Sequence, residues 1–123
     1  MANPSVSLTN YYGIQYALSN VAAGTTDAVL VAGVAGYLIN VKALVVSGPT
    51  NTQFTLNDKT VSVSTPITCL FSNGAEAGFV LPFCGPGWCQ TLNAGSGLTV
   101  TTTAGGTLGF QILYTLVPAA GGR

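Results

Sequence analysis

Histidine is absent from this chain, and charged residues are scarce: three basic and three acidic residues occur among 123. Acid-base catalysis near neutral pH commonly relies on histidine or on paired carboxylates. The acids Asp27, Asp58 and Glu76 stand in three separate turn or strand-end segments, where we interpret each as a surface-turn residue. The composition therefore argues against an enzyme, and we assign no catalytic residue.

The formal net charge is zero, and lysine and arginine form no cluster. Nucleic-acid binding needs a basic footprint, so we expect no nucleic acid as a partner. The sequence also lacks a polybasic segment, a lipidation signature and a run of about 18 uninterrupted apolar residues, so we expect no membrane partner. Residues 1–7 lack the positive and apolar regions of a signal peptide, which predicts synthesis in a cytoplasm.

Cysteine is represented by Cys69, Cys84 and Cys89, an odd number that does not suggest a disulfide framework. We interpret the three as buried thiols, although a bridge between Cys84 and Cys89 across the Gly85-Pro86-Gly87 turn remains open. Their spacing does not match a zinc site. Neither this turn nor Gly95-Ser96-Gly97 opens a helix with a phosphate-binding lysine. We therefore assign no metal and no cofactor.

Apolar residues make up 48% of the chain. A surface with so few charges gives little protection against association. We therefore expect much of the exterior to contact copies of the chain or neighbouring proteins. The alternative is a soluble monomer whose surface is rich in hydroxyl and amide groups.

Two long strands are predicted by alternating apolar residues. In the first, bounded by Gly36 and Gly48, one face is expected to point into the core and the other to be wetted at its centre. The expected core face is Tyr37, Ile39, Val41, Ala43 and Val45, and the opposite face is Leu38, Asn40, Lys42, Leu44 and Val46. The second strand carries a core face of Leu108, Phe110, Ile112, Tyr114 and Leu116.

Shorter strand-like runs recur every 8 to 12 residues between turn signals, which is typical of an all-β sandwich or barrel. Asp27 to Ala32 is apolar on both faces and is predicted to be a central strand. Asn57-Asp58-Lys59 is predicted to be a tight reversal, and Pro82 places the run from Phe79 at a sheet edge or at a bulge. Trp88 is expected to be buried as a core plug, that is, to fill space in the core. The alternative is an exposed indole that serves as a platform for a sugar ring.

No window has a convincing helical period. The predicted fold is all-β, a single jelly-roll β-sandwich of about eight strands over residues 14–118. An extended N-terminal arm over residues 1–13 and a flexible tail over residues 119–123 complete the domain organisation. The arm carries Leu8, Tyr11 and Tyr12, which either anchor on a neighbouring subunit or pack on their own domain.

The later half of the sequence resembles a recurrent β-rich domain of tailed-bacteriophage virion proteins. The resemblance spans residues 26–117 and includes the long strand that ends at Gly48. The residues that carry it are Phe79-Val80-Leu81-Pro82, Gly87-Trp88, Thr91, Gly95, Leu98-Thr99-Val100-Thr101 and Gly109 to Tyr114. It implies a jelly-roll module that often trimerises on the capsid, neck or tail, and it brings no catalytic residues.

A short chain with a brief arm looks most like a capsid decoration, or cement, protein. The resemblance thus implies a homotrimer bound to the major capsid protein on the capsid surface of the virion. The basic residues expected beside the long strand are reduced to Lys42, which joins Leu8, Tyr11 and Tyr12 as a candidate interface residue. The alternatives are a tail or neck fibre adhesin and a carbohydrate-binding jelly roll in which Trp88 and a tyrosine form the platform.

Overall fold

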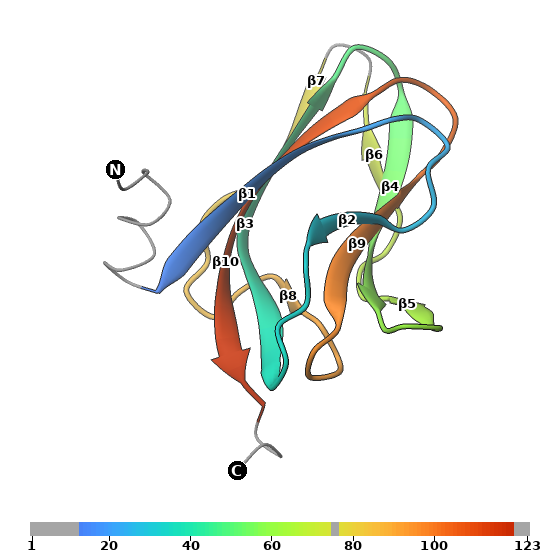
Figure 1. Cartoon of the computed structure of the whole chain (residues 1–123). Coiled ribbons are helices and arrows are strands. Elements are labelled where there is room, and N and C mark those ends of the chain that lie inside the picture. Colours follow the sequence, from blue (N-terminus) through green and yellow to red (C-terminus); the bar gives the residue numbers. More distant parts are fainter. Residues whose placement is uncertain (1–12, 75–76, 120–123) are drawn as a thin grey trace, which may run out of the picture.

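The computed structural model describes residues 13–74 and 77–119, which form two antiparallel sheets packed face to face as a β-sandwich (Figure 1). Sheet A has the order β1-β10-β3-β7, and β8 also pairs with β3. Its strands are β1 (Ile14–Val21), β3 (Tyr37–Gly48), β7 (Ala77–Leu81), β8 (Cys89–Gln90) and β10 (Leu108–Pro118). The predicted all-β sandwich is confirmed.

Sheet B has the order β2-β9-β4-β5, and β6 also pairs with β4. Its strands are β2 (Ala28–Val31), β4 (Thr52–Lys59), β5 (Ser64–Pro66), β6 (Phe71–Asn73) and β9 (Gly97–Thr102). Of the ten strands in the described residues, β3 and β10 exceed ten residues, and these two pair with each other along the middle of sheet A.

The core lies between the sheets and is built from alternating faces of β10, β4 and β9, of which the face of β10 is the one that the sequence predicts. Leu108, Phe110 and Ile112 are buried to 1% exposure or less. Phe54 contacts aromatic rings from both sheets, with centroids 5.4 Å from Phe71, 5.5 Å from Phe79 and 5.3 Å from Phe110. This aromatic cluster connects the two layers.

The predicted core face of β3 is correct at Ile39, Val41 and Ala43, which are buried, and wrong at Tyr37, which is 38% exposed, and at Val45. Val41 pairs with Tyr114 and Ala43 with Leu113, so Lys42 is an extra residue that forms a β-bulge. The bulge reverses the alternation: Ile39 and Val41 are buried before it, whereas Leu44 and Val46 are buried after it. Val45, predicted to be a core residue, is 39% exposed.

Two further sequence predictions in sheet B are wrong. The run from Asp27 is not central, because β2 lies at the edge of sheet B, where β9 is its one partner among the described strands, and Val29 is 62% exposed. The chain does not reverse at Asn57-Asp58-Lys59, which continue β4 in register with β9. The reversal follows, where the Thr60 amide donates to the Val63 carbonyl at 2.8 Å.

The predicted edge at Pro82 is confirmed, since β7 lies at the end of sheet A and stops at Leu81. The chain then turns at Gly85-Pro86-Gly87, where the Gly87 amide donates to the Cys84 carbonyl at 2.9 Å. Gly87 has a φ of 93°, and a side chain there would collide with the amide of Asn40. Only glycine fits this close approach to β3.

Candidate interaction surface

The outward face of sheet A carries a row of exposed side chains that crosses four strands. Register pairs Leu18 of β1 with Gln111 of β10, Gln111 with Val45 of β3, and Val45 with Val80 of β7. Directly paired residues project from the same face of a sheet. Leu18 is 63% and Val80 59% exposed. We call Leu18, Gln111, Val45 and Val80 the outer row.

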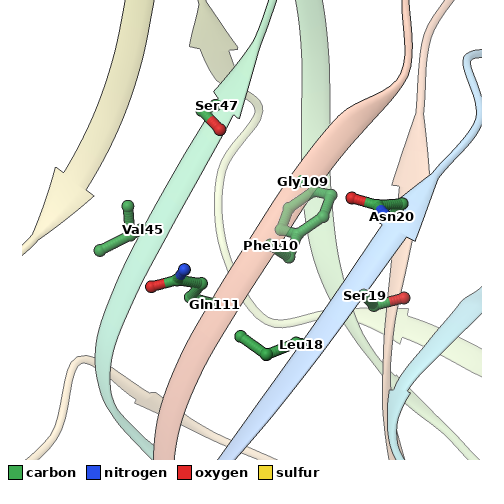
Figure 2. Close-up of a pocket in the computed structure, with 8 residues that line it drawn as sticks. All are labelled: Leu18, Ser19, Asn20, Val45, Ser47, Gly109, Phe110 and Gln111. Carbon is green, nitrogen blue, oxygen red and sulfur yellow. The ribbon is translucent and has the colours of Figure 1, made fainter.

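A shallow groove of about 390 Å³ lies beside the outer row (Figure 2). The next set of paired residues is Asn20, Gly109, Ser47 and Gly78, and its two glycines leave the surface hollow. A β-carbon added at Gly109 would lie 3.2 Å from Asn20 Oδ1. Figure 2 shows Leu18, Gln111 and Val45 side by side at one end of this groove, with Asn20 and Ser47 beside Gly109.

On the other side of the outer row, a cavity of about 200 Å³ is lined by Tyr16, Ala43 and Leu113 together with Leu18 and Val45. Groove and cavity thus offer apolar carbon, amide and hydroxyl groups, and no acidic or basic side chain is among the described residues that line them. Such a surface can exclude water against another protein and form neutral hydrogen bonds.

The outward face of sheet B is polar and centres on Asp27. Ser64 Oγ and Thr99 Oγ1 donate to Asp27 Oδ1 at 2.7 and 3.0 Å, and Lys59 Nζ lies 3.6 Å from Oδ2. The Ser64 hydrogen bond, supported by Thr99 and Lys59, lowers the pKa of this carboxyl against the opposing effect of burial. The Asp27 carboxylate therefore connects β4, β5 and β9, and both of its oxygens have partners within the protein.

Asp58 is also structural, and its prediction as a surface-turn residue is wrong. Its side chain is 1% exposed and accepts hydrogen bonds from the backbone amides of Leu92 at 2.5 Å and Asn93 at 3.0 Å. The carboxylate thus fixes the loop that leads into β9. The third acid, Glu76, lies outside the described residues.

All three cysteines are free. The bridge left open between Cys84 and Cys89 is not formed. The prediction of three buried thiols is wrong for Cys69, which is exposed, and Cys84 and Cys89 are only partly buried. Burial raises the pKa of the Cys89 thiol to about 11, which keeps it protonated at neutral pH. Within residues 13–74 and 77–119, no three histidine, cysteine or acidic side chains gather as a metal site would require.

Trp88 is not the predicted core plug, because its side chain is 46% exposed. Its Nε1 donates to the Pro82 carbonyl at 2.7 Å, which holds the indole against the turn that follows β7. Phe83, on the same turn, is 56% exposed. The turn therefore presents two aromatic residues to solvent.

The predicted interface residues Leu8, Tyr11 and Tyr12 lie outside the described residues. Lys42 stands at the bulge of β3, where its Nζ donates to the Gly85 carbonyl and its backbone carbonyl accepts from the Cys84 amide at 2.9 Å. The outer row was missed by sequence reasoning. Its member Val45 is turned outward by a bulge for which the sequence carries no local signal.

No helix in the described segments has the length and apolar character to span a membrane. No protein-family model matches the chain, and no curated protein matches it either.

Proposed function

We propose that this protein is a structural protein of a tailed-phage virion, a capsid decoration protein that binds capsid subunits through the outward face of sheet A. The observation that carries the proposal is the outer row. Three of its members, Leu18, Val45 and Val80, are apolar and exposed, and they stand on a surface almost free of charge. Exposed apolar side chains that form a contiguous patch are typical of protein interaction sites.

The strand order supports the jelly-roll form of the sandwich. With the short strands β5 and β8 set aside, four strands ordered β1-β10-β3-β7 face four ordered β2-β9-β4-β6. Successive strands alternate between the sheets, from β1 to β4 and again from β9 to β10. Eight strands in two sheets are the number expected of a jelly roll.

In this role the work of the protein is mechanical. An interface of about 1,600 Å² is sufficient for a specific contact, and contacts repeated over a capsid lattice add through multivalency. A homotrimer that carries three such surfaces would bridge several capsid subunits at once. No chemical step is required, in keeping with an assignment as a non-enzyme.

Immunogold electron microscopy tests the location directly. An antibody against this chain is applied to phage particles released from cells that carry its gene. Label on the heads is the expected result, whereas label on tails would favour a neck or tail adhesin. Particles without label would refute the virion assignment.

The surface can be tested with Val80→Lys, which places a charge in the outer row at a position that is already exposed. We expect rebinding to particles depleted of the protein to weaken at least about tenfold, because the ammonium group must be desolvated on contact. Val61→Lys, at a fully exposed position of the turn between β4 and β5, is the matched control and should bind normally. Equal binding by both variants would remove the outer row from the interface.

A second candidate function rests on Trp88, whose exposed indole is held in place through its Nε1. A fixed aromatic ring stacks on the apolar face of a sugar. Under this alternative, glycan-array binding is abolished in Trp88→Ala and retained in Phe83→Ala. An array without binding by the native chain would exclude it.

A further inference from the structure

The edges of the two sheets differ in how well they are protected against pairing with another strand. β2 has four residues and an irregular register between Val29 and Val31. β5 has three residues and ends at Pro66. β7 has five residues and is followed by Pro82. Short strands, bulges and prolines are the devices by which proteins protect sheet edges.

β1 has none of these devices. Its eight residues, IQYALSNV, contain no charge, proline or glycine. They pair with β10 in one uninterrupted register from Ile14 to Val21. β1 is the terminal strand of sheet A, as its outer position in Figure 1 shows. The described residues place no strand on its far side, so half of its backbone groups face outward along an edge without a bulge.

We propose that β1 pairs antiparallel with β1 of a second copy around a two-fold axis. Sheet A of one copy then continues into sheet A of the other. This contact goes beyond the proposed function, because it uses the strand edge and leaves Gln111, Val45 and Val80 of the outer row uncovered. It also places the outer rows of both copies on one continuous face.

A second copy is favoured because the pairing is between identical strands. In a two-fold contact between identical strands, residues near the axis lie close to their own equivalents, and like charges that meet there are destabilising. β1 has no charge to repel its equivalent, and the whole chain has a net charge of zero. A strand selected to pair with a charged partner would be expected to carry a complementary charge.

The geometry restricts the register of the contact. For the faces of the two sheets to be continuous, residues opposite each other must project from the same side. Leu18 must therefore face either Leu18 or Tyr16 of the second copy when the strands overlap near their midpoints. Leu18 is 63% exposed in the single chain, so its substitution is not expected to disturb folding.

The first test measures mass and affinity with the full-length chain at concentrations up to about 1 mM, because strand pairing alone buries less than a standard interface. Light scattering should give the mass of a dimer. It should give the mass of a hexamer if the homotrimer of the proposed function also forms. Leu18→Lys should weaken the two-fold association at least about tenfold. Val61→Lys should leave it unchanged. In the register that pairs Leu18 with Leu18, a mixture of Leu18→Lys and Leu18→Glu should associate again, since the opposite charges then face each other.

The second test is chemical cross-linking. In a Cys69→Ser background, Leu18→Cys alone should form an intermolecular disulfide in one register, and Leu18→Cys combined with Tyr16→Cys should form it in the other. Val61→Cys should not cross-link at the same rate. In hydrogen exchange, amides of β1 should gain protection with rising concentration, whereas those of β7 should not.

A monomer or a trimer at every concentration, without cross-linking through β1, would overturn the proposal. Protection of β1 that is independent of concentration and disappears when residues 1–12 are removed would also overturn it, because the arm would then cover the edge. These outcomes are independent of the immunogold result. The virion assignment can therefore fail while the strand pairing stands, and the reverse is equally possible.

Discussion

Asp27 joins three segments of the chain through one carboxylate. Its Oδ1 accepts from Ser64 of β5 and Thr99 of β9, and its Oδ2 lies beside Lys59 of β4. Its backbone has a φ of 54°, a conformation that aspartate and asparagine tolerate better than most residues. At the scale of single residues, the few charged groups whose surroundings are described serve to hold strands and loops in place.

Asp27 predicts a dependence of stability on pH. Because the pKa of Asp27 is lowered in the folded state, its contribution is complete above the unfolded pKa of about 3.9 and is lost as the pH falls through the folded value. Asp27→Asn should reduce the free energy of unfolding by about 1–2 kcal/mol at pH 7. The difference from the native chain should shrink toward pH 2. Urea denaturation at several pH values measures both profiles, and parallel profiles would contradict the prediction.

The cysteines predict an order of chemical reactivity. With a pKa of about 11, about one thousandth of Cys89 is thiolate at pH 8. Cys69, which is exposed, should be alkylated by iodoacetamide first and Cys89 at least about tenfold more slowly, as followed by mass spectrometry. In denaturant the two rates should converge. Equal rates in the folded chain would show that Cys89 is not protected by burial.

At the scale of elements, the bulge in β3 decides which side chains reach the surface. One extra residue, Lys42, separates two regular halves of the strand whose buried residues differ in phase. The same residue holds the turn at Gly85 through its side chain and the Cys84 amide through its carbonyl. The bulge thus positions both the outer row and the turn that carries Trp88.

Deletion of Lys42 should therefore be tolerated. Without it, Val41 and Leu44 are separated by one residue and both still face the core, so the fold is kept. The loss of contacts to the turn should lower stability by about 1–2 kcal/mol. Deletion of Val45 is the control, because it turns Val46 outward and should prevent cooperative folding. Near-ultraviolet circular dichroism and thermal unfolding distinguish the two variants, and similar behaviour of both would refute the assignment of the bulge.

The aromatic cluster also acts between elements, because Phe54 of β4 contacts aromatic rings on β6, β7 and β10 and so connects the two sheets. Its side chain has no exposed area. Phe54→Ala should reduce the free energy of unfolding by about 3–5 kcal/mol, through lost burial and the cavity left behind. Phe83→Ala, at an exposed position, should change it by less than about 0.5 kcal/mol. Urea denaturation gives both values, and a small effect at Phe54 would show that the cluster does not connect the sheets.

At the scale of the whole molecule, the scarcity of charge determines how copies and partners meet. Three acidic and three basic residues leave the exterior dominated by apolar, hydroxyl and amide groups. Contacts made by such a surface depend on desolvation of carbon and on neutral hydrogen bonds. Added salt should therefore affect these contacts little, because few charge–charge interactions are present for it to screen.

Self-association should accordingly be nearly independent of ionic strength. Raising sodium chloride from about 0.05 to about 0.5 M should change the association constant by less than about threefold, because no ion pair is part of the proposed contacts. Sedimentation velocity at several concentrations provides the constant. The mixed Leu18→Lys and Leu18→Glu pair is the internal control, since its association should weaken in salt. A steep salt dependence of the native chain would contradict the contacts proposed above.

The all-β class, the core face of β10 and the edge at Pro82 followed from the sequence alone. Each rests on a local rule: alternation of side chains along a strand, or the missing amide hydrogen of proline. Such rules need no knowledge of which strands become neighbours. Side-chain alternation therefore also predicted the buried residues of the part of β3 that precedes the bulge, Ile39 and Val41.

Only the tertiary structure decided what lies at the surface. The bulge at Lys42 is defined by pairing with Leu113 and Tyr114, about seventy residues away, and Val45 faces outward for that reason. The outer row draws Leu18, Gln111, Val45 and Val80 from four strands. Asp58 is buried because a distant loop donates its amides. These features depend on contacts between remote segments, for which a periodic pattern within one segment carries no information.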